Sequence, residues 1–349
     1  QYQISAKEIK YNDITQNMKL LKNAKLKTDK QGASGNIMNL NFQDSLITDI
    51  SIENNGYLFN NHYAIVNKFT PQLFQDEMQG NLIHVDFENQ NLNKIKIQGM
   101  AQSIYYVVND SSYLMGFNEA SGDTISIKYL NDDLNQIKIS GDARGIFYPE
   151  KGQTKIDSIL EYKAQFIDYN INEQKTFLKN DVEINYYNTE LISNRVMVNW
   201  TNNTLYANSD NNELSKILSQ NQKPISGEDL EFDLINKKGV INLGKTTVGD
   251  GIYKSNIIYR QEPNIYHMQK SIYTTCEHEN PHYYFRTPKM KMIQGERIIA
   301  KPLLLYIYDI PIIGVPFAVL PNKSGSRQSG WIMPSFGISQ SKGTYFQKL

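Results

Sequence analysis

Cys276, His278 and His282 lie close together in the sequence and could coordinate a metal ion. A thiolate and two imidazoles at this spacing suit Zn²⁺, but a tetrahedral site needs a fourth ligand, such as Glu277. The sequence has no second cysteine and no HExxH pattern, so we predict no metal and no other cofactor. A single cysteine cannot form an internal disulfide, so any partner of Cys276 would lie outside this chain.

Sequence patterns typical of enzymes are missing. There is no Gly-x-Ser-x-Gly elbow, phosphate loop, dinucleotide fingerprint or calcium-binding loop. Acidic residues such as Asp132, Asp133, Glu228 and Asp229 fall in expected turns, where solvated carboxylates are normal. Lys+Arg and Asp+Glu are 36 each, so no net field attracts nucleic acid. We therefore predict neither an enzyme nor a nucleic-acid partner.

The elements that position these residues are expected to be β-strands. The chain has 23 Tyr and 14 Phe with many Ile, Val and Thr, and its Asn-, Asp- and Gly-rich intervals suit turns. The longest apolar stretch, 303–320, contains Asp309, Pro311 and Pro316, which argue against a transmembrane helix. Two short helices are predicted as excursions between strands, around 71–78 and 212–220.

An internal repeat is the strongest signal in the sequence. Residues 80–106 resemble residues 122–148, and each copy alternates apolar and polar residues on both sides of a polar turn. This pattern predicts a β-hairpin. Weaker copies begin at Gly35 and Gly227, and in all four copies a glycine precedes the alternating strand.

Hairpins of this kind cannot bury an apolar face alone, so we expect them to stack into an elongated sandwich, jelly roll or solenoid. In the two strong copies, Gly99 and Gly141 are predicted to end the second strand. From about Tyr259 prolines become frequent, and irregular extended chain is expected to replace regular hairpins. Alternation gives the strong copies a shared inward face, formed by Ile83, Val85, Phe87, Ile95, Ile97, Ile125, Ile127, Tyr129, Ile137 and Ile139.

An ordered set of motifs occupies the C-terminal part. The pieces are Ser271–Cys276, Pro281–Arg286, the apolar segment with Asp309-Ile310-Pro311, Pro316-Phe317 and Pro321, and the run Arg327–Pro334. Each piece is weak, but their order and spacing resemble the lipopolysaccharide-assembly outer-membrane protein family (LptD or OstA, the organic-solvent-tolerance proteins), in its bacteroidete-like branch. Residues 162–178 and 186–200 look like the family's periplasmic hairpin domain.

The resemblance implies an all-β chain, with an elongated periplasmic β-jelly-roll or β-taco of stacked hairpins followed by the start of an outer-membrane β-barrel. Residues 1–150 would be an OstA-like repeated β-hairpin domain and residues 151–260 a periplasmic β-jelly-roll domain. Residues 261–349 would be a proline- and aromatic-rich junction and the start of the barrel, whose first strand is expected near 343–346.

The family's function is lipopolysaccharide transport and insertion into the outer leaflet, through a hydrophobic periplasmic groove that leads to a laterally opening barrel. By this resemblance the inward-facing residues become candidates to line the lipid groove, although alternation alone favours a dry core. Candidates for the junction or gate are Pro311, Pro316, Pro321, Arg327, Gly330 and Pro334. The prolines have no backbone N–H to donate, so they would keep the strands of the junction poorly paired; alternatively they are ordinary loop prolines. Arg327 would either contact a lipid phosphate or cap a turn.

Family membership would also imply partners and a location. These are lipopolysaccharide, a periplasmic bridge protein of the same fold docked edge to edge, an outer-membrane plug lipoprotein and the outer membrane, with this part mainly periplasmic. Residues 1–20 are the candidate docking edge or else a disordered terminus. Cys276 matches a family cysteine that bonds to the barrel. The rival interpretations are a periplasmic or surface β-solenoid scaffold and a β-helical polysaccharide-active enzyme.

Overall fold

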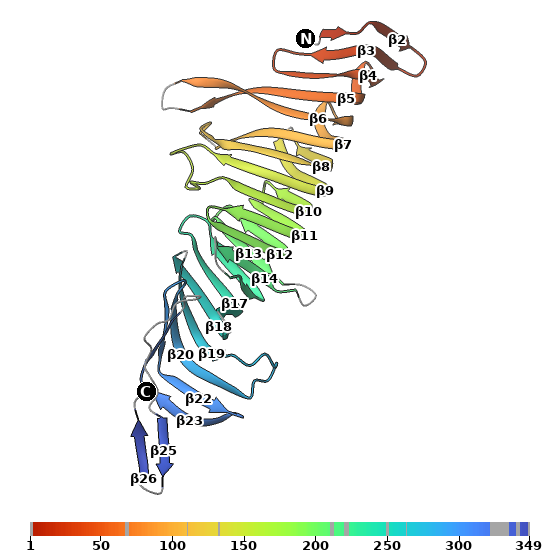
Figure 1. Cartoon of the computed structure of the whole chain (residues 1–349). Helices are drawn as coiled ribbons and strands as arrows, with labels where there is room; N and C mark the ends of the chain where they lie inside the picture. The colour runs from red at the N-terminus through yellow and green to blue at the C-terminus, as the bar shows by residue number, and fades with distance from the viewer. Residues whose placement is uncertain are drawn as a thin grey trace. The chain divides into compact units, whose positions relative to one another are not determined.

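The computed structural model describes residues 3–66, 70–109, 111–131, 133–209, 213–219, 223–248, 251–262, 264–321, 335–339 and 343–347. Within these ranges the chain forms strands and turns and no helix, so the all-β prediction is confirmed. Helices able to cross a bilayer are accordingly missing from the described part. Figure 1 labels the strands in chain order.

The chain divides into two compact units. Unit 1 comprises Gln1–Ile217 and Asp229–Lys237, and unit 2 comprises Leu218–Glu228 and Lys238–Leu349. The boundaries predicted at residues 150 and 260 stay predictions. The strands of unit 1 are β1 (Gln3–Ser5), β2 (Glu8–Asn12), β3 (Asn17–Lys27), β4 (Gln31–Gln43), β5 (Leu46–Ile65), β6 (Pro71–Glu88), β7 (Asn91–Val108), β8 (Leu114–Leu130), β9 (Asp133–Pro149), β10 (Leu160–Asn170), β11 (Lys175–Tyr186), β12 (Thr189–Asn199), β13 (Thr204–Asn208) and β16 (Asp229–Asp233), and β14 (Ser215–Ser219) crosses its boundary.

The predicted hairpins are confirmed in unit 1. From β3 to β13 each strand pairs antiparallel with the next. Asn89 and Gln90 join β6 to β7 with φ of 50° and 71°. Positive φ at both central residues is the type I′ geometry, which matches the twist of the flanking strands.

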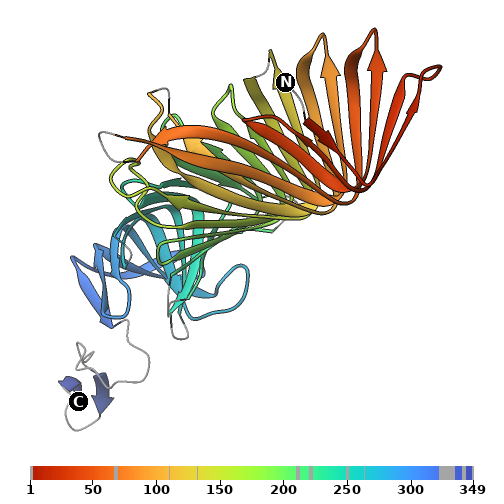
Figure 2. The ribbon, with the colours of Figure 1, turned by 90° about the horizontal axis from the view of Figure 1, so that it is seen from above.

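Each long strand of unit 1 bends sharply near its middle instead of ending there. In β7 the residues Gly99 and Met100 have φ of 74° and 53°, and in β9 Gly141 and Asp142 have φ of 77° and 45°. The pairing register shifts at these positions, as at a β-bulge. The prediction that Gly99 and Gly141 end their strands was wrong, because left-handed backbone bends a strand as well as stopping one. Figure 2 shows β4 to β9 folding at this common corner.

The corner divides each strand into two arms that we name by their inward residues. In β8 the alanine arm is 114–121 and contains Ala120, and the isoleucine arm is 124–130 and contains Ile125 and Ile127. In β9 the isoleucine arm is 133–140 and the alanine arm is 143–149. The inward side chains of the two arms face each other, so the core of this region lies inside the folded sheet.

Glycines make the corner possible in several strands. Gly80 and Gly122 lie inside β6 and β8, not before these strands as predicted. A Cβ atom on Gly80 would lie 2.5 Å from Ile97 Cγ2, and one on Gly122 would lie 2.6 Å from Ile139 Cγ2. The repeated glycine therefore reflects the isoleucine of the neighbouring strand, which occupies the space of its missing side chain.

Both predicted helices are strands. Residues 71–78 belong to β6, whose pairing with β5 extends to Ile65 and Pro71. Within 212–220, Ser215–Ser219 form β14, which pairs with β12. In both places a neighbouring strand supplies backbone hydrogen bonds, and this tertiary pairing overrides the local pattern.

Regular hairpins also continue beyond Tyr259, so the predicted irregular chain was wrong. The strands of unit 2 are β15 (Ile225–Gly227), β17 (Lys238–Val248), β18 (Gly251–Glu262), β19 (Ile265–Thr274), β20 (Tyr283–Ile293), β21 (Arg297–Lys301), β22 (Leu303–Ile307), β23 (Ile310–Val315), β24 (Ala318–Pro321), β25 (Ser335–Ser339) and β26 (Gly343–Gln347). Pro288 lies inside β20 between the stretch paired with β22 and the stretch paired with β21. Pro288 has no backbone N–H to donate, but it lies between these two paired stretches, where a strand tolerates proline.

Candidate functional site

The structure brings the ten predicted inward residues together on the isoleucine arms of β6 to β9. One row pairs Ile83, Ile97, Ile125 and Ile139 across neighbouring strands, and the next pairs Val85, Ile95, Ile127 and Ile137. Seven of the ten are 0–5% exposed, and Phe87, Tyr129 and Ile137, nearer the hairpin turns, are half-buried. The fully buried side chains thus lie near the corner and the half-buried ones nearer the mouth of the fold.

The alanine arm faces these rows with small side chains. Ala101 and Ala143 are fully buried, and Ala120 is 8% exposed. Small residues opposite large ones let the two arms approach closely and fill the space between them. Near the corner the interior of unit 1 is therefore packed.

A pair of tyrosines joins the two arms of β10. Tyr162 precedes the register shift of β10 and Tyr169 follows it, and their hydroxyl groups are hydrogen-bonded. Tyr162 also donates to Asn118 Oδ1 at 2.6 Å. Burial raises the pKa of Tyr162 to about 12, while its hydrogen bonds to Tyr169 and Asn118 oppose the rise. Sequence alternation did not indicate this pair, because the contact exists only once the strand has folded back.

Apolar cavities lie in the part of unit 1 beyond β9. Two of them have volumes of about 20 Å³ each, room for little more than one water molecule. Both are lined by Ile184, Leu205 and Leu234 among other apolar side chains. An acyl chain does not fit in either, so lipid would enter this region only if the arms moved apart.

Asp76 lies on β6 at the point where β6 and β7 separate. The pairing of β6 with β7 ends at Glu77 and Ile104. Asp76 is 4% exposed and accepts a hydrogen bond from the Tyr106 backbone N–H at 2.9 Å. His62 Nδ1 lies 3.2 Å from its other carboxylate oxygen, and burial raises the pKa of Asp76. This carboxylate replaces a backbone bond at that point, a role that nothing in the sequence indicated.

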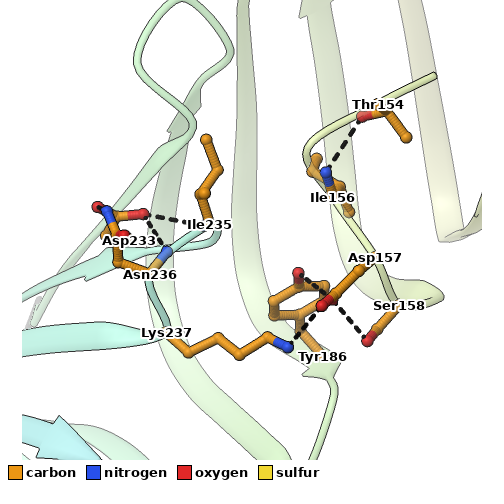
Figure 3. Close-up of polar contacts among 9 residues, drawn as sticks. All are labelled: Thr154, Ile156, Asp157, Ser158, Tyr186, Asp233, Ile235, Asn236 and Lys237. Atoms are coloured by element: carbon orange, nitrogen blue, oxygen red, sulfur yellow. Dashed lines mark hydrogen bonds and ion pairs between the residues drawn. The ribbon is translucent and has the colours of Figure 1, made fainter. Parts of the chain in front are cut away.

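A polar cluster fastens the connection between β9 and β10 to the turn after β16 (Figure 3). Asp157 Oδ2 lies 2.8 Å from Lys237 Nζ, and Asp157 Oδ1 accepts a hydrogen bond from Tyr186 at 3.3 Å. The hydrogen bond from Lys237 is the main cause that lowers the pKa of Asp157. Ile156, next to Asp157, is 5% exposed. The ion pair therefore holds an apolar residue of this connection in place.

The interior of unit 2 contains a buried arginine. Arg260 is 2% exposed and pairs in the sheet with Tyr266, which is 1% exposed. Burial lowers the pKa of Arg260, and Tyr266 opposes that change. In the same unit Tyr253, Tyr273 and Phe285 stack in a row, with ring centroids 4.7 Å and 5.9 Å apart. Nothing in the sequence singles out Arg260, because it lies in an ordinary alternating pattern of a strand.

The predicted gate residues are only partly described. Pro311 is exposed within β23, where it pairs with Tyr306, and Pro316 is exposed after that strand. Pro321 ends β24 opposite Arg297. Arg327, Gly330 and Pro334 lie outside the described residues. The gate assignment stays a prediction.

Cys276 is half-buried and forms no disulfide in the chain. Its Sγ lies 3.5 Å from His282 Nδ1, and the rings of His278 and His282 are 4.9 Å apart. Over the described ranges no cluster of three or more His, Cys, Asp or Glu side chains could hold a metal ion. A disulfide to a residue outside the chain stays a prediction.

The N-terminal edge of unit 1 is formed by β1 and β2. Both pair with β3, and every residue in both strands is exposed. Among the described strands no other one pairs with them. Docking of a partner at residues 1–20 stays a prediction.

Comparisons with known proteins give a family match and similar solved structures. Residues 298–349 match the family model described as LptD protein. No curated protein matches the sequence. The chain is also similar to the crystal structure of LptH, the LptA homologous periplasmic component of the conserved lipopolysaccharide transport device from Pseudomonas aeruginosa, with 8% identity over 42% of this chain and 94% of that one and a TM-score of 0.32.

Proposed function

This chain is LptD-like, with residues 298–349 matching the LptD protein family, and we propose that it carries lipopolysaccharide to the outer leaflet of the outer membrane. The lipid would pass through the interior of the folded sheet and leave through a laterally opening barrel. This part of the protein would lie mainly in the periplasm. The proposal involves transport and no covalent chemistry.

The observation that carries the proposal is the register of the inward rows. Ile97, Ile125 and Ile139 repeat the same aliphatic surface from strand to strand. Each CH₂ group removed from water gains about 0.8 kcal/mol, so an acyl chain of about twelve carbons gains roughly 10 kcal/mol in an apolar slot. Equivalent neighbouring positions let a chain leave one apolar site while it enters the next, which keeps the free energy nearly level along the path.

The packing of the interior adds a condition to this proposal. Ile97 and Ile125 are fully buried and Ile139 is 1% exposed, so other atoms of the protein cover all three side chains. We therefore propose that the two arms part at the mouth, beginning at the half-buried Phe87, Tyr129 and Ile137. The corner residues would act as the hinge, and the hydrogen bond between Tyr162 and Tyr169 would have to break where the lipid passes.

The burial of Ile97, Ile125 and Ile139 also favours a second function. A β-solenoid that serves as a binding scaffold also needs a dry core, and its arms would never open. The two functions differ in where lipid is found: inside the fold in a conduit, and nowhere inside it in a scaffold. A β-helical polysaccharide-active enzyme is a weaker alternative.

The proposed partners follow from the edges of the chain. The exposed strands β1 and β2 offer unpaired backbone groups to another sheet, which suits edge-to-edge docking of a periplasmic bridge protein of the same fold. An outer-membrane plug lipoprotein would bind the barrel. The prolines Pro311, Pro316 and Pro321 would keep the junction open to the membrane, and Cys276 would bond to the barrel.

The experiment that tests this function is photo-crosslinking in the complete protein during transport. An aromatic photo-crosslinker replaces the half-buried Tyr129, whose shape it matches, and in separate variants Ile127 or Ile139. Matched controls carry it at the exposed neighbours Lys128 or Lys138. We expect adducts with lipopolysaccharide at the inward positions. Adducts only at Lys128 and Lys138, in variants of unchanged thermal stability, would contradict a path through the interior.

A further inference from the structure

The outer surface of the isoleucine arms is strongly basic, although Lys+Arg and Asp+Glu are 36 each in the whole chain. From β7 to β12, away from the turns, Asp168 is the one outward acid on these arms among the described residues. Its carboxylate lies 3.5 Å from Lys138 Nζ, and the side chain of Lys138 is still 53% exposed. The outward basic residues of these arms are Lys94, Lys96, Lys128, Lys138, Lys175, Lys179 and Arg195.

The outer surface of the alanine arms is mainly acidic. Arg144 and Lys163 point outward there, but both form ion pairs. Arg144 lies 2.6 Å from Asp142, and Lys163 lies 3.8 Å from Glu183. The net charge of zero therefore conceals two surfaces of opposite sign. The outward acids of these arms from β6 to β12 are Glu77, Glu119, Glu161, Glu183 and Glu190.

A regular row of glutamates crosses the alanine arms. Pairing between neighbouring strands forms this row, which we call the acidic ladder, from Glu77, Ile104, Glu119, Ile146 and Glu161. Its glutamates recur at the offset of the internal repeat. They therefore lie on alternate strands, about 9–10 Å apart, with an isoleucine between each two. All of these side chains are exposed or half-buried.

The isoleucine arms carry a matching row of lysines. Lys96 pairs with Ser126, and Ser126 pairs with Lys138, and we call these three residues the basic ladder. The two lysines recur at the same repeat offset, so they also lie on alternate strands. Beside them, Lys94 and Lys128 are directly opposite each other, an arrangement that is unfavourable for like charges. An anionic surface placed against this face would relieve that repulsion.

The two ladders are complementary in charge, spacing and size. Where the acidic ladder has an isoleucine between two glutamates, the basic ladder has the small Ser126 between two lysines. Sheets that pack face to face keep their strands nearly aligned, so the alternate-strand spacing of one ladder fits that of the other. The aliphatic stems of lysines also cover apolar side chains such as Ile104 and Ile146. The two ladders lie on different arms and point away from each other at the corner (Figure 2), so they do not meet within one chain.

We propose that the basic ladder of one copy of this chain docks on the acidic ladder of a second copy. The contact joins two different surfaces, so each pair keeps one unoccupied ladder of each sign, and further copies add in the same way. It brings sheet faces together and leaves the strand edges at β1 and β2 unused. It also requires no lipid inside the fold, so it is independent of the transport proposal.

Sedimentation of the complete chain at several concentrations tests this association. At a salt concentration of about 0.01 M, we expect the average mass to rise with protein concentration beyond that of a dimer. At about 1 M salt the screening length falls from about 30 Å to about 3 Å. The ladders should then separate, and the chain should sediment as a monomer. Association through apolar contacts would persist at high salt.

Charge reversal identifies the two surfaces. Lys96→Glu/Lys138→Glu and Glu119→Lys/Glu161→Lys should each weaken self-association at least about tenfold, because like charges then face each other. An equimolar mixture of the two variants should associate again, since the unchanged acidic ladder of the first meets the unchanged basic ladder of the second. Lys151→Glu, in an exposed turn, makes the same kind of charge change away from the ladders and should leave the association unaltered. Circular dichroism and thermal unfolding check that every variant is folded.

Three results would overturn this inference. The chain could stay monomeric at low salt, or its association could survive Lys96→Glu/Lys138→Glu. In the third result, a chain that remains monomeric binds soluble polyglutamate and loses that binding in Lys96→Glu/Lys138→Glu, which would assign the basic ladder to an acidic partner of another kind. Photo-crosslinking inside unit 1 tests the lipid-transport proposal separately, so each proposal can fail without the other.

Discussion

Tyr162 and Tyr169 lie seven positions apart on one strand, and their hydroxyl groups meet across the interior of unit 1. Two residues at this separation in a straight strand would be more than about 20 Å apart. Their contact therefore reports directly on the fold-back of β10 at the corner. It also places a hydrogen bond across the route proposed for lipid.

Alkaline pH should destabilise unit 1 through Tyr162. The unfolded phenol has a pKa of about 10, and burial raises it to about 12 in the folded chain. Because folding raises the pKa of Tyr162, the stability that Tyr162 contributes is complete below a pH of about 10. It is lost as the pH rises toward the pKa of Tyr162 in the folded chain. We expect the free energy of unfolding to fall by on the order of 2 kcal/mol over that window.

The Tyr162→Phe variant checks this assignment. It should lose about 1 kcal/mol at neutral pH, because two hydrogen bonds to the hydroxyl disappear, and its stability should depend less on alkaline pH. Tyr63→Phe is the control, since Tyr63 is 67% exposed. Urea unfolding at several pH values measures both. An identical pH dependence for Tyr162→Phe and the unchanged chain would refute the role given to Tyr162.

Gly122→Ala should destabilise the corner by about 1–3 kcal/mol, the usual cost of overpacking a core. The added methyl group would lie 2.6 Å from Ile139 Cγ2. In the double variant Gly122→Ala/Ile139→Ala, the smaller partner should accommodate the new methyl group. We therefore expect the double variant to lose less than the sum of the two single losses in denaturant unfolding. Simple additivity would mean that the two residues do not compete for the same space.

The ion pair between Asp157 and Lys237 should secure the connection before β10 with little effect on global stability. Asp157 is 61% exposed in its side chain, and exposed pairs contribute below about 1 kcal/mol. Lys237→Met should increase hydrogen exchange in residues 150–159 and leave the isoleucine arms unaffected. Lys238→Met, at the neighbouring exposed lysine, should change neither. Unaltered exchange in 150–159 would show that other contacts hold this connection.

Acid should have the same effect as Lys237→Met. The pKa of Asp157 is lowered in the fold, mainly by its hydrogen bond to Lys237. The stabilisation is thus present above the unfolded value of about 3.9 and is lost as pH falls through the folded value. Hydrogen exchange of 150–159 should rise over this acidic window in the unchanged chain. It should rise less in Lys237→Met, where the partner is already missing.

The sequence correctly predicted features that depend on the two-residue period of a β-strand. It did not predict contacts that form only when a strand folds back on itself. Alternation correctly placed Ile97, Ile125 and Ile139 on one face, since side-chain direction in a strand is a local property. It could not distinguish a bend at Gly99 from a strand end, because left-handed backbone occurs at both. The contact of Tyr162 with Tyr169 and the burial of Asp76 depend on which strands meet, and no local pattern encodes that.

The motifs of the C-terminal part had a different outcome. They were recognised as an ordered set, and the LptD family match covers residues 298–349. Yet the proline-rich texture after Tyr259 suggested irregular chain where β18 to β20 are regular. Pro288 shows the reason: the sheet changes partner strand there, and a proline count cannot reveal such a position.

The distance between the two arms of unit 1 tests the central claim most directly. Spin labels at Glu161→Cys and Lys128→Cys, in a Cys276→Ser background, lie on the exposed side of an alanine arm and of an isoleucine arm. Pulsed electron resonance would measure their separation with and without lipopolysaccharide. Labels at Lys19→Cys and Lys128→Cys, both on isoleucine arms, provide the control. If lipid lies between the arms, the first distance should grow by roughly 4 Å, one layer of carbon contact, and the control should not change. A first distance that stays constant while lipopolysaccharide binds would contradict the account.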